Sequence, residues 1–328
     1  MTLDSNQNFE DREREFEDQI AFRYNRDYHA APLMAWHSEM FIAFIKSKYK
    51  RGDRILDLGC GPASLWTELK AQLPDMGALV GVDLSPAMID EARLLHPDGD
   101  FRVGSMFSIP AIPGEFDLVI VSSAFHHVPD KELPRSLLEI SRVMDEHGSL
   151  VGREPLMAGR VGDRGGWFAG ALMNLRHLAY RLTHTREYPE PDPGPAHHAY
   201  AAANFFEMIN ATFAVSKIEF RNPVSPFLSR VQDRKIVEIA KILDESVKHK
   251  EGQEVHYVAE KNYADFQEVH RCVELAIKEN KIENLAEFLA MVDAAAAIIE
   301  KHLTVDSAAN PNQGSQIAGD TEPTAGRE

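Results

Sequence analysis

Short apolar runs of strand length alternate with segments of helical periodicity between residues 54 and 156. The runs are rich in Val, Ile, Leu and Phe and are bounded by Gly, Pro, Asp or Ser, a pattern typical of buried strands. This alternation predicts an α/β fold in which a doubly wound, mostly parallel sheet carries helices on both faces. The predicted strands are RILDLG, ALVGVDL, FRVGS, FDLVIVSS and SLVGREP, and the predicted helices are residues 64–72, SPAMIDEAR and LPRSLLEISRVM.

The segments that flank this core are predicted to be mainly helical. Helices with a break at Pro32 are expected over residues 11–50. Downstream, AVSKIEFR is the only clear strand and is expected at an edge of the same sheet, with helices over residues 229–304. The predicted regions are an N-terminal helical cap (1–50), a ligand-binding domain (51–228) with a lid or substrate insert at about 157–212, a C-terminal helical extension (229–305) and a disordered tail (306–328).

The first predicted strand ends in ILDLGCGPA, an acid followed by two glycines. Glycines after a strand allow a sharp turn and let a ligand press against the main chain. In the nicotinamide-dinucleotide fingerprint a third glycine would follow, but that position is Ser64. The carboxylate of Asp57 would repel a pyrophosphate and suits a ligand that carries positive charge. The loop therefore favours a cationic cofactor over a dinucleotide.

Charge and cysteine content limit the partners and the compartment. The chain has 51 Asp and Glu against 35 Lys and Arg, so its formal charge of -16 opposes a nucleic-acid backbone. It has only two cysteines, Cys60 and Cys272, and a charged N-terminus where a signal peptide would be apolar. A cytoplasmic location is expected, with no membrane insertion, because no run approaches the ~18 continuous apolar residues of a span.

Five motifs in order resemble a class I S-adenosylmethionine-dependent methyltransferase of the small-molecule type, over about residues 55–156. They are the acid-x-Gly-x-Gly loop DLGCG, Asp83 after the second strand, the Ser105-Met106 pair, SSAFHHVPD after the fourth strand, and RVMDEHGSLVGREP. The resemblance implies a Rossmann-like fold and S-adenosyl-L-methionine as cofactor. It assigns cofactor binding to Asp57, Gly59, Cys60, Gly61, Asp83, Leu84, Ser105, Met106 and Ser122.

The candidate catalytic residues are His126, His127 and Glu154, which follow the fourth strand or end the fifth. A histidine can accept a proton from a hydroxyl or an amine during methyl transfer. The alternative is that both histidines only hydrogen-bond the backbone at the strand end. No metal is expected, because the downstream histidines lack a matching acidic cluster. They are His177, His184, His197 and His198.

The expected function is transfer of a methyl group to an oxygen or nitrogen of a small polar acceptor, such as a sugar derivative or a secondary metabolite. The alternative is a non-catalytic cofactor-binding or scaffold protein that acts through its helical C-terminus, which is otherwise a packing element or a homodimer surface. A nicotinamide dehydrogenase is disfavoured by Asp57 and Ser64.

The arginines after the fifth strand generate a prediction about the acceptor. In this acidic chain, residues 153–186 carry a local excess of arginine, whose donor fork suits a carboxylate or a phosphate. If Arg153, Arg160, Arg164 and Arg176 bind an anionic acceptor, replacing Arg160, Arg164 or Arg176 by Ala should weaken methylation of anionic acceptors in a salt-dependent way. The alternative is that these arginines pair with the acidic segment DREREFED or lie in solvent. Equal methylation of neutral acceptors, without loss in any variant, would reject the anionic acceptor.

Overall fold

The structure is a computed structural model, and its described residues all belong to one compact unit, residues 1–261. A second unit comprises residues 262–328, and the predictions of C-terminal helices beyond 261 and of a disordered tail fall outside the described residues. The described residues are 3–24, 32–156, 164–184, 199–221, 224, 228, 231–246, 248–249 and 254–261.

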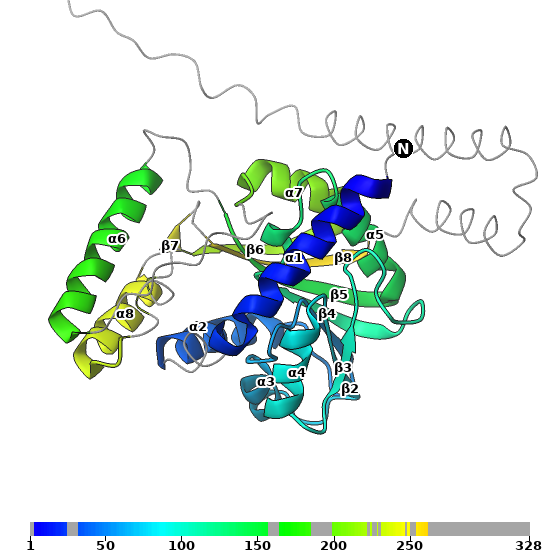
Figure 1. Ribbon diagram of the computed structural model, residues 1–328, viewed down its shortest axis with the longest axis horizontal. Coiled ribbons are helices and arrows are strands. Elements are labelled where there is room, and N and C mark those ends of the chain that lie inside the picture. The colour runs from blue at the N-terminus through cyan, green and yellow to red at the C-terminus, as the bar shows by residue number, and fades with distance from the viewer. Residues whose placement is uncertain are drawn as a thin grey trace, which may run out of the picture. The chain divides into compact units, whose positions relative to one another are not determined.

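One eight-stranded sheet forms the centre of this unit, in the order β3-β2-β1-β4-β5-β8-β6-β7 (Figure 1). The five strands from β3 to β5 are parallel, and β8, β6 and β7 continue the sheet in antiparallel pairs. The predicted α/β fold with a doubly wound, mostly parallel sheet is confirmed. The strands are β1 (Arg54–Leu58), β2 (Ala78–Asp83), β3 (Asp100–Val103), β4 (Phe116–Ser122), β5 (Met144–Pro155), β6 (Phe213–Arg221), β7 (Lys248–His249) and β8 (Glu254–Lys261).

Helices cover both faces of the sheet because successive strand residues point to opposite sides. Ile55 packs with α2, α3 and α4 in one apolar cluster, whereas Leu56 packs with α5 and α7 in the other. A third cluster joins α6 and α8 to the start of α2. The helices are α1 (Leu3–Tyr24), α2 (Pro32–Ile45), α3 (Trp66–Gln72), α4 (Pro86–Leu95), η2 (Phe125–His127), α5 (Leu133–Val143), α6 (Arg164–Thr183), α7 (Ala202–Asn210) and α8 (Arg234–Ser246).

The helical region expected over residues 229–305 is partly wrong, because β8 is a strand. It lies between β5 and β6, so the predicted edge strand AVSKIEFR, now β6, pairs with β8 and with the short β7. The first six residues of β8 are all buried. Its run EVHYVA includes Glu254 and His256, so it lacks the continuous apolar signal of a buried strand. The compact unit consequently extends past the predicted boundary at 228 to Lys261.

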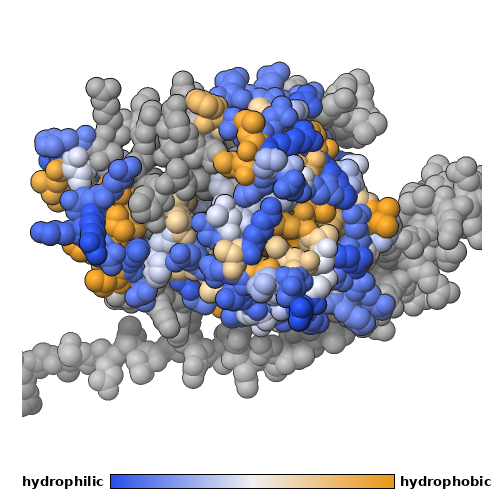
Figure 2. All heavy atoms as spheres, turned by 90° about the horizontal axis from the view of Figure 1, so that it is seen from below, coloured by the Kyte–Doolittle hydropathy of each residue, from blue (hydrophilic) through white to orange (hydrophobic). Residues whose placement is uncertain are grey.

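The outer side of α6 and α8 remains apolar in part. Leu178, Leu182, Ile239 and Ile242 are exposed. In Figure 2, seen from below, hydrophobic side chains lie among charged ones on the side of the molecule where these helices stand.

Tyr257 tests whether β8 is an integral part of the core. Its ring is fully buried and packs edge-on against Phe205 and Phe206 of α7. Tyr257→Ala should lower the free energy of unfolding by about 3–5 kcal/mol, the cost of removing a buried aromatic ring. Its register partner on β6, Ile218, is 45% exposed, so Ile218→Ala should cost much less. Equal losses in urea unfolding would contradict this packing.

Candidate functional site

The glycine loop after β1 brings the main chain close to two neighbouring segments. Gly59 and Gly61 have φ of 70° and 52°, the left-handed region that glycine tolerates. A Cβ on Gly59 would lie 2.6 Å from Cβ of Ala124 and 3.2 Å from Cε of Met106. The predicted cofactor residues Gly59 and Met106 are therefore in contact range. Only a residue without a side chain fits here.

Asp83, at the end of β2, joins this loop to the start of α4. The backbone N–H of Gly61 donates to Oδ2 at 2.8 Å, and that of Ser85 donates to Oδ1 at 2.9 Å. Burial raises the pKa of Asp83, although both hydrogen bonds act in the opposite direction. Ser85 caps α4, because its hydroxyl accepts from the Met88 N–H, and Pro86 opens the helix that was predicted over SPAMIDEAR. Leu84, between these groups, is partly buried.

Asp57 faces the interior rather than the strand edge. It is 2% exposed and accepts a hydrogen bond from the Trp66 indole at 2.9 Å. Burial raises the pKa of Asp57 to about 7, with the nearby Asp83 acting in the same direction. Cys60 is packed so closely that a Cβ on Gly81 would lie 2.9 Å from its sulfur, and burial raises the pKa of its thiol. The described contacts of Asp57 and Cys60 are thus within the protein, and their role in cofactor binding stays a prediction.

Glu154, predicted as a catalytic group, caps the short helix η2 after β4. Its fully buried carboxylate accepts the N–H groups of Ala124 and Phe125, each at 2.8 Å, and that of His126 at 3.3 Å. It also lies 3.1 Å from Nδ1 of His126. These four contacts give Glu154 and His126 a structural role at the strand end. A catalytic role for either stays a prediction.

Arg153, predicted to bind substrate, is engaged inside the protein. It is 5% exposed, and it donates to the Ser122 hydroxyl at 2.7 Å and to the His37 carbonyl at 3.3 Å. His37 in turn contacts both carboxylate oxygens of Glu254, at 2.9 and 3.0 Å. His256 lies 2.8 Å from the same carboxylate. Burial lowers the pKa of His256 to about 4, whereas the two histidines hold the pKa of Glu254 well below its usual range despite burial.

Helix α1 lies across the carboxyl ends of the strands (Figure 1), and none of its residues was predicted to bind the cofactor or to take part in catalysis. Glu10 accepts a hydrogen bond from the hydroxyl of Ser105, a predicted cofactor residue. Asp18 accepts from the Ser85 hydroxyl at 2.5 Å and from the Ala87 N–H at 3.2 Å. The signal in the sequence was the acidic segment DREREFED, whose partners are strand-end residues here.

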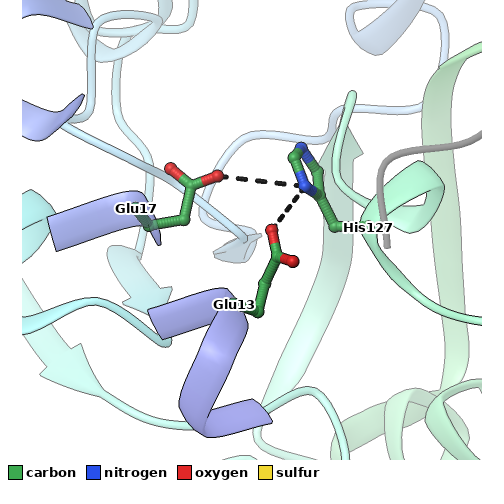
Figure 3. Close-up of side chains that lie close together, drawn as sticks. All are labelled: Glu13, Glu17 and His127. Atoms are coloured by element: carbon green, nitrogen blue, oxygen red, sulfur yellow. Dashed lines mark hydrogen bonds and ion pairs between the residues drawn. The ribbon is translucent and has the colours of Figure 1, made fainter. Parts of the chain in front are cut away.

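His127 meets two further acids of α1, as Figure 3 shows. Its Nδ1 lies 2.7 Å from Oε1 of Glu13 and 3.8 Å from Oε1 of Glu17. Burial lowers the pKa of His127, but the hydrogen bond to Glu13 and the charge of Glu17 outweigh it and leave the pKa raised. Burial raises the pKa of Glu17 to about 7; His127 opposes this, whereas Asp83 and Glu13 add to it.

The Glu13, Glu17 and His127 side chains are close enough to share a cation, because their ligand atoms lie within 4.8 Å of one another. His127 is not one of the histidines that were considered as metal ligands from the sequence. His177 and His184 are exposed, whereas His197 and His198 fall outside the described residues. The expected absence of a metal stays a prediction.

The remaining predicted substrate residues lie on or before α6. Arg160 falls outside the described residues, and for Arg164 only the position at the start of α6 is described. Arg176 lies over the ring of Tyr180 at 5.6 Å from its centroid. The described part of α6 packs with α8 and α2, so its contact with an acceptor stays a prediction.

Comparison with known proteins finds relatives in sequence for the parallel part of the sheet. Residues 55–148 match the family model of a methyltransferase domain. A demethylmenaquinone methyltransferase of Symbiobacterium thermophilum is 32% identical over 147 residues, which cover 42% of this chain and 57% of the relative. A malonyl-acyl-carrier-protein O-methyltransferase of Legionella pneumophila is 37% identical over 103 residues, which cover 30% of this chain and 34% of the relative. The aligned regions are thus about a third to three fifths of these relatives.

A solved structure from Thermotoga maritima has the same fold. It is an S-adenosylmethionine-dependent methyltransferase described as a possible histamine N-methyltransferase. The TM-score is 0.51 at 14% identity, and the match covers 76% of this chain and 100% of that chain. The matches in sequence show that residues 55–148 are similar to a methyltransferase domain, and this likeness in structure shows the fold of the class I S-adenosylmethionine-dependent methyltransferases. The matched segment of this chain contains the glycine loop, Asp83 and the strands around them.

The described residues fit the cofactor of this class, S-adenosylmethionine. A Cβ on Gly61 would meet no atom within 4 Å, so the loop is open at this position, and Asp83 presents a carboxylate beside it. Among the described residues, the charged groups that act most strongly on His127 are the acids Glu13, Glu17 and Glu154, which suits a ligand that carries a sulfonium and an ammonium group. Ser122, the last predicted cofactor residue, is held by Arg153 at the end of β4. Within the described residues, no helix is both long and apolar enough to cross a membrane.

Asp83 supplies the test of the cofactor site. Asp83→Asn should weaken S-adenosylmethionine binding by roughly 1.5–3 kcal/mol, because the ribose hydroxyls lose a charged acceptor. Binding is measured by calorimetry, with Asp90→Asn on the exposed side of α4 as the matched control. A thermal melt checks that the loop still folds, since Asp83 also holds Gly61 and Ser85. Unchanged affinity in a folded variant would reject this assignment.

Proposed function

We propose that the chain transfers a methyl group from S-adenosylmethionine to an oxygen or nitrogen of a small polar acceptor. The observation that carries this proposal is His127, a basic side chain placed directly after β4, at the edge that holds Asp83 and the glycine loop. The matches in sequence to methyltransferases over residues 55–148 support the reaction class. They cover only part of the chain and do not identify the acceptor.

The cofactor supplies an electrophilic methyl group, and the protein's part is to orient the acceptor and to receive its proton. Glu13 lies beside Nδ1 of His127, which favours the tautomer that donates from Nδ1 and keeps its lone pair on Nε2. Nε2 is then the atom that accepts the proton. The carboxylate also stabilises the resulting imidazolium ion.

His127 is favoured over the two other candidate bases. His126 is buried and lies against Glu154, and Glu154 accepts backbone N–H groups with both oxygens. A proton acceptor needs to reach the acceptor atom within hydrogen-bond distance. His127 is 22% exposed at its side chain, whereas His126 is 7% and Glu154 is 0% exposed.

The anionic character proposed for the acceptor rests on Arg160, Arg164 and Arg176. Arg153 is used for Ser122 and His37, which removes it from the set that would meet an anion. The alternative function, a non-catalytic cofactor-binding protein, rests on the C-terminal region, which lies outside the described residues beyond Lys261. Incubation with methyl donor and a panel of small hydroxyl and amino compounds separates the two. Cofactor binding without S-adenosylhomocysteine formation on any of them would favour the alternative.

His127→Ala should lower turnover by ~10²-fold or more while the affinity for the cofactor changes little. His126→Ala should mainly reduce stability, because His126 belongs to the cap of η2. Turnover is measured as S-adenosylhomocysteine formation and affinity by calorimetry. Full turnover in His127→Ala would shift the role of base to His126 or Glu154.

The pH profile gives an independent check of the base. The pKa of His127 is raised above 6.5, and only its neutral form can accept a proton from the acceptor. Turnover should therefore rise with pH through an apparent pKa above 6.5. Glu13→Gln removes a negative charge that helps to raise this pKa, so the rising limb should move to lower pH. A limb that stays in place in this variant would exclude the pair as the base.

A further inference from the structure

Four acids of α1 contact the strand ends at which the cofactor residues lie. Glu10 binds Ser105, Asp18 binds Ser85, and Glu13 and Glu17 approach His127. Glu13 and Glu17 are four residues apart, so they project from the same face of the helix. The helix therefore adds its own charged side chains to the edge formed by β2, β3 and β4.

This edge carries more negative than positive charge among the described residues. The groups that act most strongly on Glu17 are one histidine, His127, and three acids, Asp83, Glu13 and Asp18. The second oxygen of Glu13, Oε2, has no hydrogen-bond partner among the described residues, and the side chain is only 6% exposed. A buried carboxylate oxygen without a donor is costly. A ligand with positive charge would remove that cost.

We propose that Glu13 and Glu17 recognise the positive charge of the cofactor, so that α1 distinguishes S-adenosylmethionine from its product S-adenosylhomocysteine. This inference rests on the proposed function, because it uses the same cofactor site. The donor carries a sulfonium, whereas the product carries a neutral thioether at that sulfur. Attraction by the acids is strongest before the transfer and falls when the methyl group leaves, which favours release of the product over the donor.

A metal ion is the other cation that this cluster could hold. Two carboxylates and an imidazole are ligands for divalent metals, and their ligand atoms lie within 4.8 Å. However, Nδ1 of His127 is already hydrogen-bonded to Glu13 at 2.7 Å, and the cluster adjoins Asp83, the acid assigned to the cofactor's ribose. The observations favour the cofactor, and the metal becomes an outcome of the test.

The test compares a cationic ligand with a neutral one that has the same adenosine and amino-acid groups. In sinefungin a carbon that bears a charged amino group replaces the methylated sulfur, whereas S-adenosylhomocysteine has an uncharged thioether at this position. Calorimetry in the presence of EDTA should show that Glu17→Gln raises the Kd of sinefungin about tenfold and changes that of S-adenosylhomocysteine by less than about twofold. Glu15→Gln, an exposed position on the same helix, should leave both values unchanged.

The number of protons released on ligand binding gives a second test, because a purely structural role of Glu17 would not change it. Glu17, with a pKa of about 7, is partly protonated at neutral pH, and a nearby cation favours its charged form. Binding of sinefungin at pH 7 should release a fraction of a proton, seen as a heat that depends on the buffer. Neither the Glu17→Gln variant with sinefungin nor the parent with S-adenosylhomocysteine should show this release.

Three outcomes would overturn the proposal, and a further one concerns the proposed function. Equal weakening of both ligands in Glu17→Gln would make Glu17 a packing residue, and no weakening would exclude it from the site. A preference for sinefungin that appears only without EDTA, and is restored by added Mn²⁺, would assign the acids to a metal. If the parent protein binds neither ligand, the cofactor assignment itself fails, which is distinct from binding without charge preference.

Discussion

The carboxylate of Asp83 is the interaction on which the geometry of the site depends. It accepts one N–H from the glycine loop after β1 and one from the first turn before α4, so a single side chain fixes two strand ends relative to each other. The loop can approach because Gly59 has no side chain to meet Ala124. Burial makes the charged form of Asp83 costly, and these two donors partly offset that cost. A cofactor hydroxyl would complete the same set of hydrogen bonds.

A second buried network connects the site to the antiparallel part of the sheet. Arg153 links Ser122 at the end of β4 to His37 of α2, and Glu254 on β8 contacts His37 in turn. The charge of Arg153 also opposes the effect of burial, which raises the pKa of Asp57. Arg153 and Glu254 are both almost fully buried, and either charge alone would be strongly destabilising. Each charge is therefore stabilised by the presence of the other. The strand β8 thus supplies charge as well as apolar surface to the domain.

The sequence predicts those features of the fold and site that depend on local pattern. Apolar runs and turn residues locate all five parallel strands, and Ser85 with Pro86 locates the start of α4. What it misses depends on pairing between distant residues. Glu254 and His256 interrupt the apolar pattern of β8 and are tolerated only because His37 and Arg153 lie beside them. Likewise, nothing local to α1 indicates that Glu13 would meet His127 across more than a hundred residues of chain.

The charged residues proposed to bind the cofactor and those proposed to bind the acceptor lie in different segments of the chain. The acids of α1 meet the strand ends of β2 to β4, where positive charge on a ligand is favoured. An anionic acceptor would be repelled from the same acids, and Arg153 is committed to internal partners. Recognition of an anion would therefore depend on arginines after β5, such as Arg160 and Arg176. Under these proposals the acids of α1, before the first strand, would bind the positive charge of the cofactor, and the arginines between β5 and β6 would bind the negative charge of the acceptor. The donor and the acceptor can then carry opposite charges without competing for the same side chains.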